Sequence, residues 1–228
     1  MHRRGERLAY FDKRFFQFFE GLSMDNSKAY FDSNRKVYEQ AIREPFKELV
    51  ADMIMRIREH EPEIAIEPKD AIFRINRDIR FSKDKSPYKT HVGAHISRRG
   101  RKDHQYPGFY FQLSHEKVMV AGGVWMPDKD GVHRVRTHIA QDPDDFKRVI
   151  DDKVFQETYS EVMGDRLKRI PPEFKEAFEV QPYVANKQWY YHADIGPEVI
   201  VSDDLSDKLM EYHSAGQGVA GYLREALG

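Results

Sequence analysis

The stretch GFYFQLSHEKVMVAGGVWM, residues 108–126, contains the clearest pair of strands in the sequence. Two runs rich in aromatic and β-branched residues flank the tripeptide HEK, and so short a connection is typical of an antiparallel hairpin. Gly122 and Gly123 predict a bulge or bend in the second strand. The segment therefore predicts an antiparallel sheet in the middle of the chain.

Further strands are expected on both sides of this hairpin. The segment HVGAHIS, residues 91–97, is a candidate strand. In residues 71–81, apolar and polar side chains alternate with the period of a half-buried strand. The aromatic and β-branched run PYVANKQWYYHADI, residues 182–195, indicates another strand.

Helical spacing of apolar residues marks the regions around the strands. An apolar stripe steps by three or four positions over residues 8–22, and Pro45 predicts a break or kink near Glu44. Helical signals return over residues 132–150 and, as two pieces, over residues 202–227. Helices, then a largely antiparallel sheet, then helices favour the α+β class, as a single domain formed by the whole chain.

Capping residues mark two boundaries in the helical regions. Asp25, Asn26 and Ser27 offer caps for a second helix near the start of the chain. A boundary within the later helical region falls at Asp142 and Pro143.

The composition is that of a globular protein with a strongly charged surface. The 228 residues are 40% hydrophobic and 33% charged, so the chain can bury a core without disulfides or metal. Cysteine is absent, which excludes disulfides and thiolate chemistry and fits a reducing compartment. The basic N-terminal segment is followed by no apolar signal segment, and no run reaches the ~18 apolar residues that span a membrane. We therefore expect a cytoplasmic protein with no membrane partner.

The charge is distributed unevenly along the chain. Residues 74–104 contain ten Lys or Arg and three Asp, a local charge of +7, although the net charge of the whole chain is −1. A basic segment in an acidic protein indicates an anionic ligand or an acidic partner, and composition leaves both open. The pI of 6.8 makes bulk nucleic-acid binding the weaker expectation.

Arg77 is the most informative candidate residue. If residues 71–81 form one strand, Arg77 lies on its inward face with Phe73 and Ile75, and a desolvated guanidinium must be paired. Its partner is either a carboxylate from the helical layer, in a buried ion pair, or the anionic group of a ligand, in a pocket with Arg77 as its floor. The sequence leaves both alternatives open.

Other candidates for ligand binding surround Arg77 or follow it in the sequence. The lysines of the turn SKDKSPYK, residues 82–89, either are simply solvated or gather around a phosphate or carboxylate group. The aromatic candidates either pack in the core or stack on a ligand. The expected ligand-binding residues are Arg77, Arg80, Lys83, Lys85, Tyr88, Lys89, Trp125 and, from the following helix, Arg136.

Catalytic and metal-binding patterns are weak. Neither a P-loop nor a GxSxG motif occurs, and Asp78 and Asp84 are acid–base candidates only because they lie in the basic segment. His91 and His95, four residues apart in a strand, would lie about 13 Å apart, too far to share one metal ion. We predict no metal site, and the sequence identifies no cofactor.

The motifs FRINRDIRFSKDKSPYKTHVGAH, YPGFYFQLS and GGVWMP resemble the signatures of Domain of Unknown Function 2461, a family of bacterial and fungal proteins. FFEGLSMDNSKAYFDSNRKVYEQAIREPF resembles the N-terminal helices of that family, and VHRVRTHIAQDPDDFKRVI and LKRIPPEF resemble its later segments. The resemblance covers roughly residues 15–223 and implies a single α+β domain. It implies no particular activity.

These observations lead to one principal hypothesis about function. We expect a domain that binds or acts on a small anionic, phosphorylated ligand through a cationic pocket. The alternative is a non-enzymatic module whose basic segment docks an acidic protein partner, with nucleic-acid processing a weaker third. The sequence predicts neither a reaction nor an oligomeric state.

Overall fold

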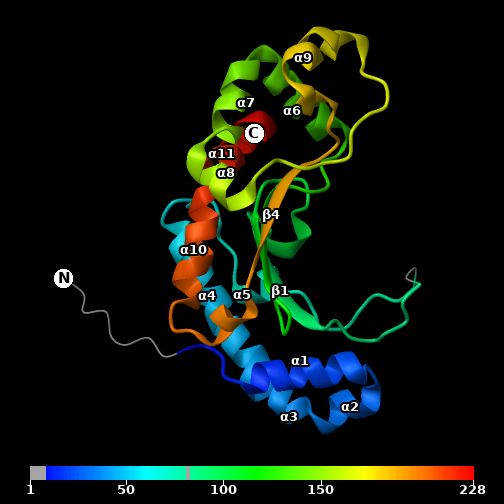
Figure 1. The fold of residues 1–228 in the computed structure, drawn as a ribbon, viewed down its shortest axis with the longest axis vertical. Coiled ribbons are helices and arrows are strands. Elements are labelled where there is room, and N and C mark those ends of the chain that lie inside the picture. Colours follow the sequence, from blue (N-terminus) through cyan, green and yellow to red (C-terminus); the bar gives the residue numbers. More distant parts are fainter. Residues whose placement is uncertain (1–8, 81–82) are drawn as a thin grey trace, which may run out of the picture. The chain divides into compact units, whose positions relative to one another are not determined.

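The computed structural model, which describes residues 9–80 and 83–228, contains a four-stranded antiparallel sheet with helices (Figure 1). The strands follow one another in the sheet in the order of the sequence. They are β1 (His91–Ile96), β2 (Phe109–Ser114), β3 (Val118–Val124) and β4 (Trp189–Ile195). The predicted α+β class and the predicted hairpin at residues 108–126 are therefore confirmed.

Backbone contacts group the chain into two compact units. Of the described residues, the first unit comprises 9–80, 83–101, 110–120 and 194–210, and the second comprises 102–109, 121–193 and 211–228. That the whole chain forms one domain stays a prediction.

The first unit contains the N-terminal helices, which bury a cluster of aromatic rings. Phe11 and Phe15 are buried and their ring centroids lie 5.0 Å apart, as the apolar stripe predicts. Ser27 caps the second helix, since its hydroxyl accepts a hydrogen bond of 3.1 Å from the Tyr30 amide. The helices are α1 (Arg14–Met24), α2 (Lys28–Ser33), α3 (Arg35–Tyr38), α4 (Glu44–Arg58) and α5 (Pro68–Ala71).

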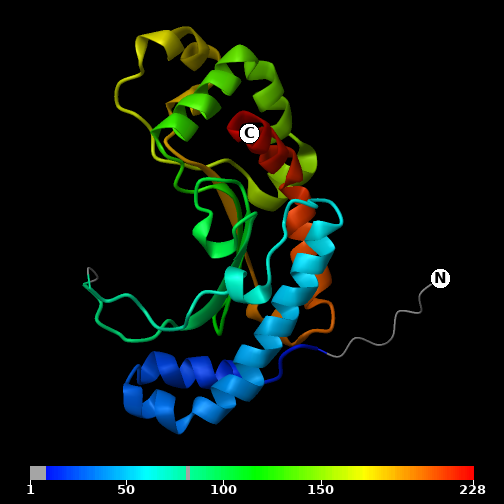
Figure 2. The same cartoon turned by 180° about the vertical axis from the view of Figure 1, so that it is seen from behind.

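The predicted break near Glu44 takes the form of a π-helical turn. This turn, Glu39–Arg43, connects α3 to α4, and Pro45 lies in the first turn of α4, where no intrahelical donor is required. From there α4 packs against α5 and β1 (Figure 2).

The strands present one buried face and one half-buried face. Val92 and Phe111 belong to the buried face, and the Phe111 ring lies 5.8 Å from the ring of Phe46 in α4. The alternate residues on β1 and β2 remain partly exposed, as expected when helices cover only one side of an antiparallel sheet. The half-buried face carries His91, His95, Tyr110 and Gln112.

The second unit is built mainly of helices around Phe146 and Tyr222, whose ring centroids lie 5.0 Å apart. The predicted boundary at Asp142 is confirmed, because its carboxylate accepts a hydrogen bond of 3.0 Å from the Asp145 amide and so caps the next helix. The helices are α6 (Lys129–Gln141), α7 (Pro143–Ile150), α8 (Lys153–Tyr159), α9 (Lys175–Val180) and α11 (Gln217–Leu227). α10 (Leu205–Ala215) precedes α11, as the two predicted C-terminal pieces require.

The predicted strand over residues 71–81 is wrong. Ala71 ends α5, and the extended backbone that follows makes only isolated bridges, from Ile72 to Ala94 and from Asn76 to Tyr88. Regular pairing stops because the chain diverges after the amide of residue 77 donates to the carbonyl of residue 87. Phe81, at the expected end of the strand, lies outside the described residues.

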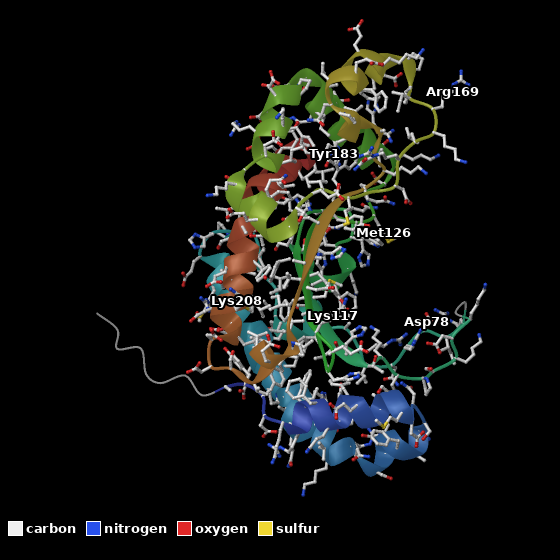
Figure 3. All side chains as sticks on the ribbon, viewed as in Figure 1. Asp78, Lys117, Met126, Arg169, Tyr183 and Lys208 are labelled. Carbon is white, nitrogen blue, oxygen red and sulfur yellow. The ribbon has the colours of Figure 1, made fainter. Side chains whose placement is uncertain are left out.

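Beyond this short ribbon, residues 78–80 and 83–86 form an arm that extends away from β1 (Figure 1). Asp78 lies on this arm (Figure 3). Ile79, expected to face the core, is 36% exposed because the arm carries it away from the sheet. The charge-rich segment is thus divided between a sheet edge and a projecting arm.

Over residues 9–80 and 83–228, none of the helices combines the length and the apolar character that crossing a membrane requires.

Candidate anion-binding site

Four basic side chains lie where the arm joins the sheet: Lys89 and, near enough to interact with it electrostatically, Arg74, Arg77 and His91, called here the cation cluster. Antiparallel backbone pairing aligns the two segments that carry them. The Lys89 amide donates to the carbonyl of Ile75 at 2.8 Å, and the Arg77 amide donates to the carbonyl of residue 87 at 2.9 Å. The cluster lies wholly within the first unit.

Lys89 is the central cation of this cluster. Its Nζ lies 5.1 Å from the centroid of the Phe73 ring, a cation–π geometry. Burial, together with the charges of Arg74 and Arg77, lowers the pKa of the Lys89 ammonium. Within the part of the chain that the structure describes, no carboxylate or carbonyl oxygen is hydrogen-bonded to this ammonium. A half-buried cation beside two others is thus left without a counter-ion from the described residues.

His91, the first residue of β1, is a neutral member of the cluster at neutral pH. Burial, then the charges of Lys89 and Arg77, lower its pKa to about 4. Its imidazole therefore presents one N–H donor and one acceptor nitrogen beside the fixed cations.

Arg77 pairs with a carboxylate of the chain, but this pair is neither the buried ion pair with a helix nor the ligand contact that the sequence predicts. Its guanidinium forms an ion pair with Asp84 of the arm, not with a carboxylate from the helices, and the Arg77 side chain is 32% exposed. The alternation expected for Arg77, on the same side as Phe73 and Ile75, holds over this short ribbon. Asp84 is therefore the carboxylate of the cation cluster: it pairs with Arg77, and the described structure gives it no bond to Lys89.

The half-buried sheet face continues the site with neutral polar groups. The Tyr110 hydroxyl donates to Gln112 Oε1 at 2.9 Å, and the Tyr110 ring lies 6.0 Å from the Phe73 ring. A Cβ at residue 93 would lie 3.0 Å from the Tyr110 hydroxyl, so a side chain there would require this hydroxyl to shift by a few tenths of an ångström. Burial raises the pKa of Tyr110 to about 12, so its hydroxyl stays protonated.

Sequence reasoning missed Gln112 as a member of this surface. The period-two alternation of FYFQLS, residues 109–114, predicts that Gln112 lies on the same face as Tyr110.

Several of the expected ligand-binding residues lie on the arm and interact there with neighbouring groups of the arm. Arg80 binds Asp78 through two hydrogen bonds of 3.0 and 2.7 Å. Lys85 Nζ donates to the carbonyl of Ile79 at 2.8 Å, and Lys83 is exposed. In the observed arm Arg80 and Lys85 therefore have local partners, and that these residues gather with Arg77 around one anion stays a prediction.

Asp78 and Asp84 are unsuited to the acid–base role expected of them. The hydrogen bond with Arg80 holds the pKa of Asp78 at about 2. Hydrogen bonds from Ser86 and the charge of Arg77 lower the pKa of Asp84. Carboxylates stabilised in the ionised form are weak proton acceptors at neutral pH, so the structure gives both a charge-pairing role.

Tyr88 is a core residue, which corrects its expected role as a ligand-stacking group. Its ring is 7% exposed and stacks on Phe31 with centroids 4.2 Å apart and an angle of 11°. The side chain of Asn26 donates to the Tyr88 carbonyl at 3.1 Å and accepts from its amide at 3.0 Å. Tyr88 therefore anchors the end of the arm to the first two helices.

Arg136 and Trp125 belong to the second unit. Arg136 is buried, and its Nε and Nη2 donate to the carbonyls of Val184 at 3.0 Å and Asn186 at 2.8 Å. Its expected contribution to an anion pocket is wrong, because these bonds use the guanidinium to support the backbone. Trp125 is 54% exposed and packs edge-on against Tyr190 at 4.6 Å, and its stacking on a ligand stays a prediction.

Among the residues whose positions are described, no three His, Cys, Asp or Glu side chains are grouped in a way that could hold a metal ion. We assign no metal ligands.

The fold and the site together define an α+β protein with a cation cluster at the edge of an antiparallel sheet. The sequence model of the family described as "Conserved hypothetical protein (DUF2461)" matches residues 14–222. The chain therefore belongs to this family, as the motifs of the basic segment and the hairpin indicated. A comparison with curated proteins finds no match.

Proposed function

We propose that the protein binds a small anionic, phosphate-bearing ligand at the cation cluster. The observation that carries this proposal is Lys89, a half-buried ammonium beside Arg74 and Arg77 with no hydrogen-bonded oxygen among the described residues. Burying a charge is unfavourable unless an opposite charge compensates it. An anion at Lys89 supplies that compensation.

A phosphate group suits the remaining chemistry of the cluster. Its oxygens accept hydrogen bonds from several donors at once, and a guanidinium can bind two of them in a planar fork. The neutral imidazole of His91 adds a donor without adding a charge. The ring of Phe73 and the hydroxyl of Tyr110 lie next to this position and are available to the organic part of a ligand.

The arrangement supports binding more directly than catalysis. Of the four side chains in the cation cluster, His91 alone is neutral at neutral pH, and its pKa of about 4 makes it a weak proton acceptor there. The cluster therefore offers no strong general base, and the proposed function requires none.

Thermal unfolding in the presence of phosphate and phosphorylated metabolites tests the proposal, with ionic strength held constant by chloride. We expect at least one of these anions to raise the unfolding temperature, because a ligand that binds only the folded state stabilises it. Lys89→Met retains an unbranched apolar chain over Phe73 and should abolish the shift. Lys83→Met, on the arm, removes the same charge from an exposed position and should leave the shift unchanged.

If no anion stabilises the wild type, or if Lys89→Met responds as the wild type does, the cation cluster is not the binding site.

The projecting arm supports docking of an acidic protein as a second candidate function. Arg80, Lys83 and Lys85 are exposed on it, and positive side chains on a projecting segment can meet an acidic surface. This candidate predicts that Lys83→Met weakens partner capture in a salt-dependent way and that Lys89→Met does not. The same pair of variants therefore separates the two functions.

A further inference from the structure

Asp84 occupies the position that an anion would take at Arg77. One oxygen of its carboxylate, Oδ2, pairs with Nη1 of Arg77. The other oxygen, Oδ1, accepts a hydrogen bond of 2.9 Å from the Ser86 amide, which fixes the carboxylate within a local turn of the arm. The arm thus delivers a carboxylate of the chain itself to the cation cluster.

We propose that Asp84 is a resident competitor at this site: it lowers the affinity of every anion that must displace it from Arg77 by the same factor, so that appreciable binding is left to ligands that also engage Lys89, namely those carrying a dianionic phosphate monoester group. The inference rests on the proposed function and assigns the class of ligand and the device that selects it. In the ligand-bound state the phosphate bridges Arg77 and Lys89, and Asp84 is released to solvent.

The selection follows from what each ligand can offer to Arg77. A monocarboxylate replaces Asp84 with an identical group, and it competes against a carboxylate that the arm holds at high effective concentration. A phosphate monoester carries close to two negative charges at neutral pH and three acceptor oxygens, so it can neutralise Arg77 and Lys89 together. The dianion alone therefore gains an interaction that Asp84 does not provide, because Asp84 makes no bond to Lys89 in the structure.

Displacement is feasible because the ion pair is accessible to water. The side chains of Arg77 and Asp84 are 32% and 52% exposed. A pair this exposed favours its closed state by no more than about fivefold, since surface ion pairs are weak. A dianion can overcome such a preference without unfolding the arm.

The test compares Asp84→Asn with Asp78→Asn, two variants of the arm that remove the same charge. An asparagine at residue 84 can still accept the hydrogen bond from the Ser86 amide, so the local turn is retained. Residue 78 forms its ion pair with Arg80, and within the cation cluster its electrostatic interaction is with Arg74, not with Arg77 or Lys89, so its variant controls for the change in overall charge. Dissociation constants for inorganic phosphate and for acetate are measured by NMR titration at mildly alkaline pH, where phosphate is mainly a dianion.

We expect Asp84→Asn to bind phosphate about threefold to fivefold more tightly than the wild type. It should also gain measurable binding of acetate, whereas Asp78→Asn should match the wild type. In an Arg77→Gln background the effect of Asp84→Asn should disappear, because the competitor then has no site to occupy.

Three outcomes overturn the inference, and they are distinguishable. If wild type binds phosphate and Lys89→Met does not, but Asp84→Asn binds with unchanged or weaker affinity, Asp84 is no competitor and the proposed function stands. If Asp78→Asn tightens binding as much as Asp84→Asn, the effect is one of overall charge. If neither the wild type nor Asp84→Asn binds phosphate, the proposed function fails and the inference fails with it.

Discussion

Acid should destabilise this protein in a way that depends on His91. Its pKa in the folded protein is about 4, compared with an ordinary value of 6.5, because the imidazole is buried beside Lys89 and Arg77. Below pH 6.5, His91 is protonated in the unfolded chain, whereas in the folded chain it stays neutral until the pH approaches 4. Stability is therefore lost as the pH falls through this window, and it is retained above it.

The two pKa values set the size of the effect. They differ by about 2.5, and at about 1.4 kcal/mol for each pH unit the folded state loses about 3.5 kcal/mol over the whole window. About 2 kcal/mol of this is lost by about pH 5. In His91→Gln, which cannot titrate, this part of the acid loss should be absent.

Urea unfolding at about pH 7.5 and about pH 5 measures the difference, since carboxylates that titrate contribute equally to wild type and variant. His192→Gln is the matched control, because residue 192 is an exposed histidine on β4. We expect the wild type and His192→Gln to lose about 2 kcal/mol more than His91→Gln. If all three proteins lose the same free energy of unfolding between the two pH values, or if His91 titrates with an ordinary midpoint by NMR, the buried imidazole of His91 does not cause the acid destabilisation.

Three further predictions concern positions outside the cluster. Gly123→Ala should destabilise the protein by about 3 kcal/mol, because Gly123 has a φ of 88° and a Cβ would meet the carbonyl of the next strand. Gly221→Ala, in a helix where a Cβ would make only an ordinary van der Waals contact with Arg224, should be neutral or stabilising by up to about 1 kcal/mol. Arg136→Met should cost about 2–4 kcal/mol in thermal or urea unfolding, since two buried carbonyls lose their donors. Asn26→Leu should cost about 1–2 kcal/mol and increase hydrogen exchange at Tyr88, because it removes both of its backbone bonds to that residue.

The parts of the fold that were predicted correctly are those in which local pattern and tertiary packing agree. In the hairpin of β2 and β3, alternating side chains correspond to a buried and a half-buried face. At Asp142 the capping carboxylate and the following proline fix the start of a helix through local bonds alone. These features need little knowledge of distant segments.

Residues 71–81 show where this agreement ends. Their alternation holds for Phe73, Ile75 and Arg77, yet a strand requires a partner along its whole length, and the chain that pairs with them diverges after residue 87. Apolar and charged residues also alternate in the arm, where Ile79 is exposed. Whether a partner strand continues is decided by tertiary contacts that the local pattern does not record.

The candidate site was predicted in its location and charge but not in its membership. The basic segment does place Arg77 and Lys89 together, because two antiparallel stretches bring them to one sheet edge. Arg80 and Lys85 lie only a few residues away in sequence, and the arm gives them local partners. The participation of His91 depends on its burial, which its position in the sequence does not reveal.

Binding of an anion at the junction of the arm and the sheet can be measured by an NMR titration of the protein with phosphate. We predict saturable changes in the amide resonances of residues 74–77 and 89–93, and no such changes at these positions in Lys89→Met. Saturable changes centred on other residues, or identical changes in the variant, would contradict binding at this junction.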